Sequence, residues 1–161
     1  MTKKNYLPVY TLSEELINAI SHGVGTCLSI AALVLCIVQA AVNGTVAGVV
    51  SACIYGVSLT MLYIMSTLYH AITNRTARKV FRVFDHTSIF FLIAGTYTPI
   101  TLVTLGGALG WTLFGIVWGV AILGIVLNAV SIEKFKKFSM ICYVCMGWAA
   151  LIGIKTIYEN M

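Results

Sequence analysis

Charged residues divide the chain into long apolar stretches. No Asp, Glu, Lys or Arg occurs at positions 16–74, 86–132 or 138–154. The first stretch holds 59 residues, and a single helix of that length would be about 90 Å long. One helix needs only about 20 apolar residues to cross the hydrocarbon core of a bilayer. The first two stretches are therefore each predicted to fold back as a helical hairpin, and the third predicts one further helix.

Two groups of helix-breaking residues place the turns inside these hairpins. Asn43-Gly44-Thr45 interrupts the first stretch, and Gly106-Gly107-Ala108-Leu109-Gly110 interrupts the second, because Asn and Gly readily adopt turn dihedrals. Hydrocarbon offers backbone amides no partner outside their own helix. The predicted fold is therefore all-α: one polytopic membrane domain over residues 1–161, with transmembrane helices at about 16–42, 46–72, 84–104, 111–131 and 138–158.

Composition excludes a soluble domain. Hydrophobic residues make up 60% of the chain and charged residues 9%, whereas soluble domains carry about 25% charged residues. A cleaved signal peptide is not expected, because the first apolar run is too long and no small-residue cleavage site precedes a polar mature domain. The lipid bilayer is therefore the first expected partner.

The basic residues predict how the bundle is oriented. Short loops rich in Lys and Arg mark the cytoplasmic side of a membrane protein. These residues gather before the first predicted helix, between the second and third, and between the fourth and fifth: Lys3, Lys4, Arg75, Arg78, Lys79, Arg82, Lys134, Lys136 and Lys137. The protein is therefore predicted to lie in the cell membrane with its N-terminus on the cytoplasmic side. The net charge of +5 is a topology signal and does not indicate a nucleic-acid partner, because the basic loop between the second and third helices is short and has no aromatic residue to stack bases apart from Phe81 at its edge.

Few ionisable residues lie near the predicted spans, and such residues mark candidate functional sites. Ser66 and His70 are four residues apart, which places them on one helix face near the cytoplasmic end. Asp85 and His86 stand at the cytoplasmic start of the next predicted helix, at the same depth. A neutral imidazole is a good zinc ligand, and a carboxylate suits a supporting role beside it. Two interpretations stay open: a cytoplasm-facing metal site, or local hydrogen bonds with Asp85 as a helix cap.

A second polar group lies at the entry to the first helix. Glu15, Asn18 and His22 share one face, and Ser13 is the expected cap, with Glu14 in the first turn. Two interpretations of this group stay open: helix capping together with interhelical hydrogen bonds, or a functional role.

Three further patterns predict packing. Pro99 is expected to bend the third helix, with neighbouring threonines satisfying carbonyls. Small residues in rows let helices approach closely in lipid, within the chain or between copies; the rows are Gly48-Ala52-Gly56 and Gly115-Gly119. Cys142 and Cys145, although spaced C-x-x-C, are interpreted as packing residues of a span.

Several motifs together resemble those of a known family. The segment from Glu14 to Gly23, the Ser66-x-x-x-His70 motif, Asp85-His86 with the run from Leu92 to Pro99, and Met146-Gly147-Trp148 occur in the order of the haemolysin III family. That family belongs with the progestin and adipoQ receptors, which include the adiponectin receptors. The resemblance covers essentially the whole chain.

The resemblance implies a seven-helix bundle with a cytoplasmic N-terminus. It also implies a Zn²⁺ cofactor held by His70, with Asp85 positioning the zinc-bound water and Ser66 beside the site. The other two family ligands come from an H-x-x-x-H motif in the seventh helix, and this sequence, which ends at Met161, contains no such motif. Truncation relative to the family is therefore expected, with the missing C-terminal helices or a second copy of the chain as partners.

Two functions follow as expectations. One is a haemolysin III-like membrane protein of the bacterial cytoplasmic membrane, cytolytic or serving membrane homeostasis, with a partial zinc site. The alternative is a zinc-dependent hydrolase of lipid amides or esters that uses metal on His70 together with Asp85.

Overall fold

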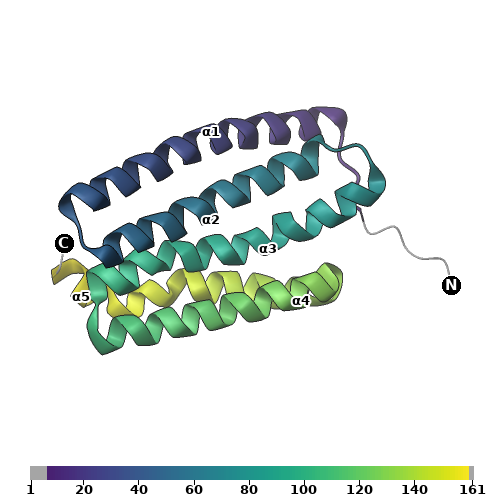
Figure 1. Cartoon of the computed structure of the whole chain (residues 1–161). Coiled ribbons are helices and arrows are strands. Elements are labelled where there is room, and N and C mark those ends of the chain that lie inside the picture. The colour runs from purple at the N-terminus through teal and green to yellow at the C-terminus, as the bar shows by residue number, and fades with distance from the viewer. Residues whose placement is uncertain (1–6, 160–161) are drawn as a thin grey trace.

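The computed structural model describes residues 7–159 of the protein, and these residues form helices joined by short connections (Figure 1). The elements are α1 (Leu12–Asn43), α2 (Val46–Ala71), α3 (Arg75–Pro99), a π-helical turn η1 (Ile100–Leu105), α4 (Gly107–Trp148), a 3₁₀ turn η2 (Ala149–Gly153) and α5 (Ile154–Glu159). The all-α prediction is confirmed. Four described helices are long and apolar enough to span a membrane: residues 12–42, 46–71, 75–105 and 107–159.

The last of these spans folds back on itself. Ser131, inside α4, has extended dihedrals (φ −166°, ψ 106°), and beyond it the chain returns alongside its first arm (Figure 1). Ser139 Oγ donates a hydrogen bond of 2.8 Å to Asn128 Oδ1, although eleven residues of straight helix would separate them by about 16 Å. The structure thus breaks α4 where the fourth predicted helix ends. The number of membrane crossings and the seven-helix architecture stay predictions.

The connection between α2 and α3 is shorter than expected. A basic loop was predicted up to residue 83, but α3 begins at Arg75, capped by Asn74, whose side chain accepts from the amides of Thr76 and Ala77. Asp85 therefore lies ten residues inside the helix. The prediction that Asp85 stands at a helix start is wrong, and so is the alternative interpretation of Asp85 as a helix cap.

The start of α1 also differs from the prediction. Thr11, and not Ser13, is the N-cap: its hydroxyl accepts from the Glu14 amide while the Glu14 carboxylate accepts from the Thr11 amide at 2.7 Å. This reciprocal arrangement is a capping box. It engages Glu14 at the helix end and leaves Glu15 on a different face of α1.

The predicted bend at Pro99 appears as a change of helix type. The α-helical backbone gives way to a π-helical turn directly after Pro99, which lacks the amide hydrogen of a regular helix. The hydroxyls of Thr98 and Thr101 donate to the carbonyls of Ala94 and Tyr97 at 2.9 and 2.8 Å. Chain direction then reverses at Gly106 and Gly107, both at positive φ.

Small residues set how closely the helices approach. A Cβ on Gly56 would lie 2.3 Å from Leu33 of α1, and one on Gly124 would lie 2.3 Å from the Phe90 ring of α3. Gly115 and Gly119, in contrast, face open space, so within residues 7–159 this second row contacts no helix. Successive helices pack in sequence order, and the core lies between α3 and the two arms of α4, around Phe90.

Candidate functional site

Three helices bring ionisable side chains together at one end of the bundle. Glu15 of α1 lies between His70 of α2 and Arg78 of α3. His70 Nδ1 and Glu15 Oε2 are 2.7 Å apart, and the other carboxylate oxygen accepts a hydrogen bond from Arg78 Nη2. Asp85 of α3 interacts electrostatically with His70. We call Glu15, His70, Arg78 and Asp85 the polar centre.

These side chains are largely shielded from the surroundings. The exposed fraction is 9% for the side chain of His70, 13% for Glu15, 19% for Arg78 and 18% for Asp85. Charges at such burial are stable only when they are paired and hydrogen-bonded. The Glu15 carboxylate meets that need for two neighbours at once, and it thereby ties α1, α2 and α3 together at this end.

Aromatic rings surround His70. The ring centroids of Tyr69, Tyr10 and His22 lie 4.7, 5.6 and 6.3 Å from that of His70, and the Arg78 guanidinium stacks over Tyr69 at 5.3 Å. Such cation–π stacking offsets part of the cost of burying the guanidinium. The imidazole of His70 is thus held by a carboxylate on one nitrogen and by rings around it.

The sequence-predicted residues are only partly assembled. Ser66 is buried one turn from His70 on α2, but no hydrogen bond within the described part of the chain joins it to His70 or Asp85. His86 Nδ1 lies 3.5 Å from Asp85 Oδ2, an ion-pair distance without a formed hydrogen bond. The sequence left two roles open for Glu15, helix capping with interhelical hydrogen bonds or a functional role. In the structure Glu15 contacts His70 directly.

Arg78 is the residue that sequence reasoning missed, because it was interpreted only as a cytoplasmic charge. A signal was available: Arg78 lies seven residues before Asp85, so once this segment is helical both side chains share a face. That signal depended on α3 beginning at Arg75 and not at residue 84.

The polar centre is not a complete metal site within residues 7–159. A tetrahedral zinc site needs at least three protein ligands, and within residues 7–159 no group of three His, Cys, Asp or Glu side chains could hold a metal ion. His70 nevertheless has the arrangement of a ligand, since a carboxylate on Nδ1 orients the ring and leaves Nε2 for a metal. The described residues therefore fit one zinc ligand and not a complete site.

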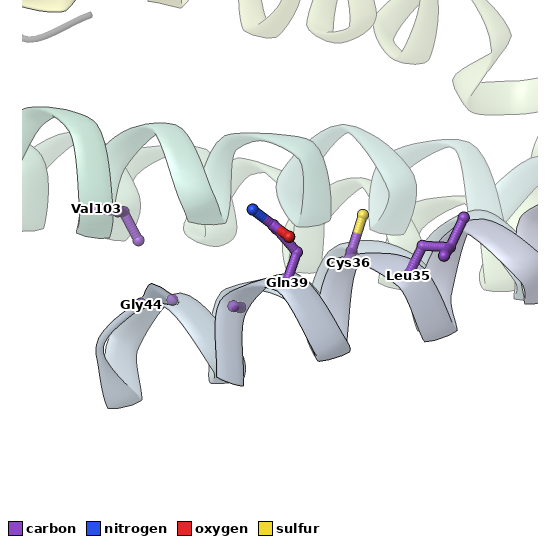
Figure 2. Close-up of a pocket in the computed structure, with 7 residues that line it drawn as sticks. Leu35, Cys36, Gln39, Gly44 and Val103 are labelled. Atoms are coloured by element: carbon purple, nitrogen blue, oxygen red, sulfur yellow. The ribbon is translucent and has the colours of Figure 1, made fainter. Parts of the chain in front are cut away.

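A wide hollow lies at the opposite end of the bundle, where α1 and α2 meet η1. Figure 2 shows Cys36 and Gln39 of α1 beneath Val103 of η1. This wide groove of about 630 Å³ is lined mostly by apolar side chains, and none of its lining residues is Asp, Glu, His, Lys or Arg. The groove therefore differs in chemistry from the polar centre, whose side chains are ionisable.

The comparisons with known proteins agree with this architecture. A family model described as "Haemolysin-III related" matches residues 10–161. The chain belongs to the haemolysin III family. It is 46% identical to Hemolysin-3 of Bacillus cereus over 161 residues, which cover the whole chain and 74% of that relative. It is 44% identical to a Hemolysin-3 homolog of Bacillus subtilis over 153 residues, covering 95% of the chain and 72% of the relative.

More distant similarity extends beyond haemolysin III. Over 112 residues the chain is 28% identical to the human Monocyte to macrophage differentiation factor, covering 66% of the chain and 47% of the relative. This match agrees with the resemblance of the haemolysin III motifs to the adiponectin-receptor-like superfamily. No solved structure matches the chain. Family membership and the apolar helices together identify a multi-pass membrane protein.

Proposed function

We propose that this haemolysin III protein acts on the lipid bilayer and that its activity depends on the polar centre, where His70 is a ligand for Zn²⁺. The observation that carries the proposal is the 2.7 Å contact between Glu15 Oε2 and His70 Nδ1. A buried carboxylate behind an imidazole fixes the tautomer and strengthens the other nitrogen as a ligand. When bound, zinc would supply a Lewis acid at this end of the bundle.

The remaining ligands would have to come from outside residues 7–159, from a second copy or from another chain. Asp85 would hold a hydrogen-bond donor near His70, and Ser66 would line the site one turn away. The proposed location is the bacterial cytoplasmic membrane, with the polar centre facing the cytoplasm, as the position of the basic residues favours.

Zinc analysis of the protein purified in detergent tests the metal assignment. We expect bound zinc that is lost in His70→Ala, and an affinity about 10–100-fold lower in Glu15→Gln, because the supporting carboxylate is removed. Glu133→Gln is the matched control: it removes a carboxylate at the same end of the bundle, 40% exposed and paired with Arg82. Less than about a tenth of a zinc ion per chain, unchanged in His70→Ala, would refute His70 as a zinc ligand.

Membrane activity has its own test. The relatives' name, hemolysin, suggests bilayer damage, so we expect dye release from liposomes that contain the protein. Release equal to that caused by an inert helical membrane protein at the same density would count against lytic activity. Activity that persists in His70→Ala would separate lysis from the polar centre and contradict the proposed link.

Hydrolysis of lipid amides or esters is the second candidate, favoured by the largely buried carboxylate of Asp85, which acts electrostatically on His70. Asp85 would accept the proton of the attacking water as a general base. Fatty-acid release from ceramide and phospholipid substrates should then fall about 100-fold or more in Asp85→Asn and stay unchanged in Glu133→Gln. No release above the background of the Asp85→Asn variant would exclude this candidate for the isolated chain.

A further inference from the structure

A second cavity with polar walls lies near the turn at Ser131. It has a volume of about 190 Å³ and is bounded by α3 and by both arms of α4. None of the residues of the polar centre lines it, so it is a separate site at the same end of the bundle. Its polar walls come from five side chains: His86, Asn128, Lys136, Ser139 and Tyr143.

The buried part of the wall is a preformed hydrogen-bonding network. Asn128 is 1% exposed and Ser139 is 5% exposed, and the Ser139 hydroxyl donates to Asn128 Oδ1 at 2.8 Å. This bond fixes the carboxamide with its oxygen engaged, so that its NH₂ group is left to donate. Asn128 also hydrogen-bonds the side chain of Tyr143, whose hydroxyl donates to the His86 carbonyl at 3.2 Å. An amide nitrogen has two donor hydrogens, so one is available to a ligand.

His86 adds a second nitrogen to the wall. Its Nδ1 is buried, makes no hydrogen bond and lies 3.5 Å from an Asp85 carboxylate oxygen. Because Nδ1 faces Asp85, Nε2 is the ring nitrogen left for a ligand. The donors of this wall are the Asn128 amide and the Lys136 ammonium, and donors around a cavity are complementary to an oxyanion, since an anion needs several hydrogen bonds to replace its water.

Charge and apolar surface specify the ligand further. Lys136, exposed at the cavity, brings an ammonium group with three donors. The remaining wall is hydrocarbon from Ile89, Ile132 and Met140, and Met140 is 60% exposed on the outer face of the bundle. A site that combines a cation and an amide donor with an apolar side matches a phosphate group attached to acyl chains. Basic pockets between helices on the cytoplasmic side bind anionic headgroups in this way.

We propose that this cavity binds a phosphate group, carried by an anionic phospholipid of the cytoplasmic leaflet, with Lys136 and Asn128 as its donors. The bound lipid would clamp α3 to both arms of α4. The proposal requires neither zinc nor the polar centre, so its outcome is independent of the function proposed above.

Titration of the delipidated protein in detergent tests the proposal. Phosphatidylglycerol, phosphatidylcholine and inorganic phosphate are added in separate titrations. Binding is measured by native mass spectrometry and by tryptophan fluorescence. We expect phosphatidylglycerol to bind tighter than phosphatidylcholine, and Lys136→Gln to weaken it about tenfold or more, as expected for a lost charged hydrogen bond. Lys137→Gln is the matched control, because it removes the same charge from the next position, which does not line the cavity. Its loss should be no more than about fivefold, the effect of one surface charge.

Each outcome decides the proposal. Equal weakening by Lys136→Gln and Lys137→Gln would overturn it, because only diffuse surface charge would then matter. Competition by millimolar inorganic phosphate would support the phosphate site with a free anion as its ligand, and absence of competition would support the lipid. Ser139→Ala provides an independent check: it frees the Asn128 carboxamide to rotate, and binding unchanged in both Ser139→Ala and Lys136→Gln would refute the cavity as the site.

Discussion

The contact between Gly124 of α4 and Phe90 of α3 leaves no room for a single added methyl group. A Cβ on Gly124 would lie 2.3, 2.4 and 2.6 Å from three carbons of the Phe90 ring. Ordinary contact begins near 3.4 Å, so ring or helix would have to move by about 1 Å. The ring has nowhere to go, because Phe90 is fully buried and Tyr143 packs on it at a centroid distance of 4.5 Å.

Gly124→Ala should therefore destabilise the bundle, and Gly115→Ala is its matched control. Both substitutions lie in the first arm of α4, and both gain the higher helix propensity of Ala, worth about 1 kcal/mol. A Cβ on Gly115 meets nothing within 4 Å. The difference between the two variants isolates the steric cost, expected at about 1–3 kcal/mol for overpacking a tight core.

The measurement is the free energy of unfolding in mixed micelles, from titration with a denaturing detergent followed by circular dichroism and tryptophan fluorescence. Gly115→Ala should equal or exceed the parent protein in stability, and Gly124→Ala should fall below both. If the two variants unfolded at the same detergent fraction, the packing of α3 against the first arm of α4 would be wrong.

Three further predictions address the connections, the polar centre and the topology. Gly106→Ala should cost about 1–3 kcal/mol in the same titration, because φ 59° and ψ −169° form a region that is essentially glycine-only; an unchanged midpoint would contradict this turn geometry. Glu15→Gln should cost about 3 kcal/mol by leaving a buried guanidinium without its carboxylate, whereas Glu133→Gln, at a half-exposed pair, should cost less than about 1 kcal/mol; similar losses would show that the polar centre is not buried. In a cysteine-free background, single cysteines at Asn74 and Gly107 should react with impermeant reagents from opposite sides of the membrane, and labelling of both from one side would refute the predicted orientation.

The sequence determined the class of the protein because lipid is a demanding solvent. Backbone groups in hydrocarbon must be satisfied within a helix, so long charge-free runs left little choice of secondary structure. The turns at Asn43-Gly44 and Gly106-Gly107 could be predicted from the sequence because Asn and Gly adopt turn dihedrals that other residue types avoid. Motif order was sufficient to predict the family, and the family match confirmed it.

Helix ends were predicted less well, since they depend on competing polar contacts. The charges of Arg75, Arg78 and Arg82 suggested a loop, yet Asn74 caps a helix there. Within that helix Arg78 pairs with Glu15 and Arg82 with Glu133. The start of α1 was also misplaced, because Thr11 rather than Ser13 caps it. Two residues of the same chemistry stood two positions apart, and only the path of the chain selected between them.

Tertiary structure alone decided which polar groups meet. Glu15 and His70 are 55 positions apart, and nothing in local spacing indicates that the Glu15 carboxylate lies between an imidazole and a guanidinium. The cavity between His86 and Lys136 likewise exists only because α4 reverses at Ser131 and brings Ser139 back to Asn128. Periodicity and solvation are properties of short segments and can be read along the chain, whereas pairing of buried charges depends on how neighbouring helices are rotated and aligned, which only their packing fixes.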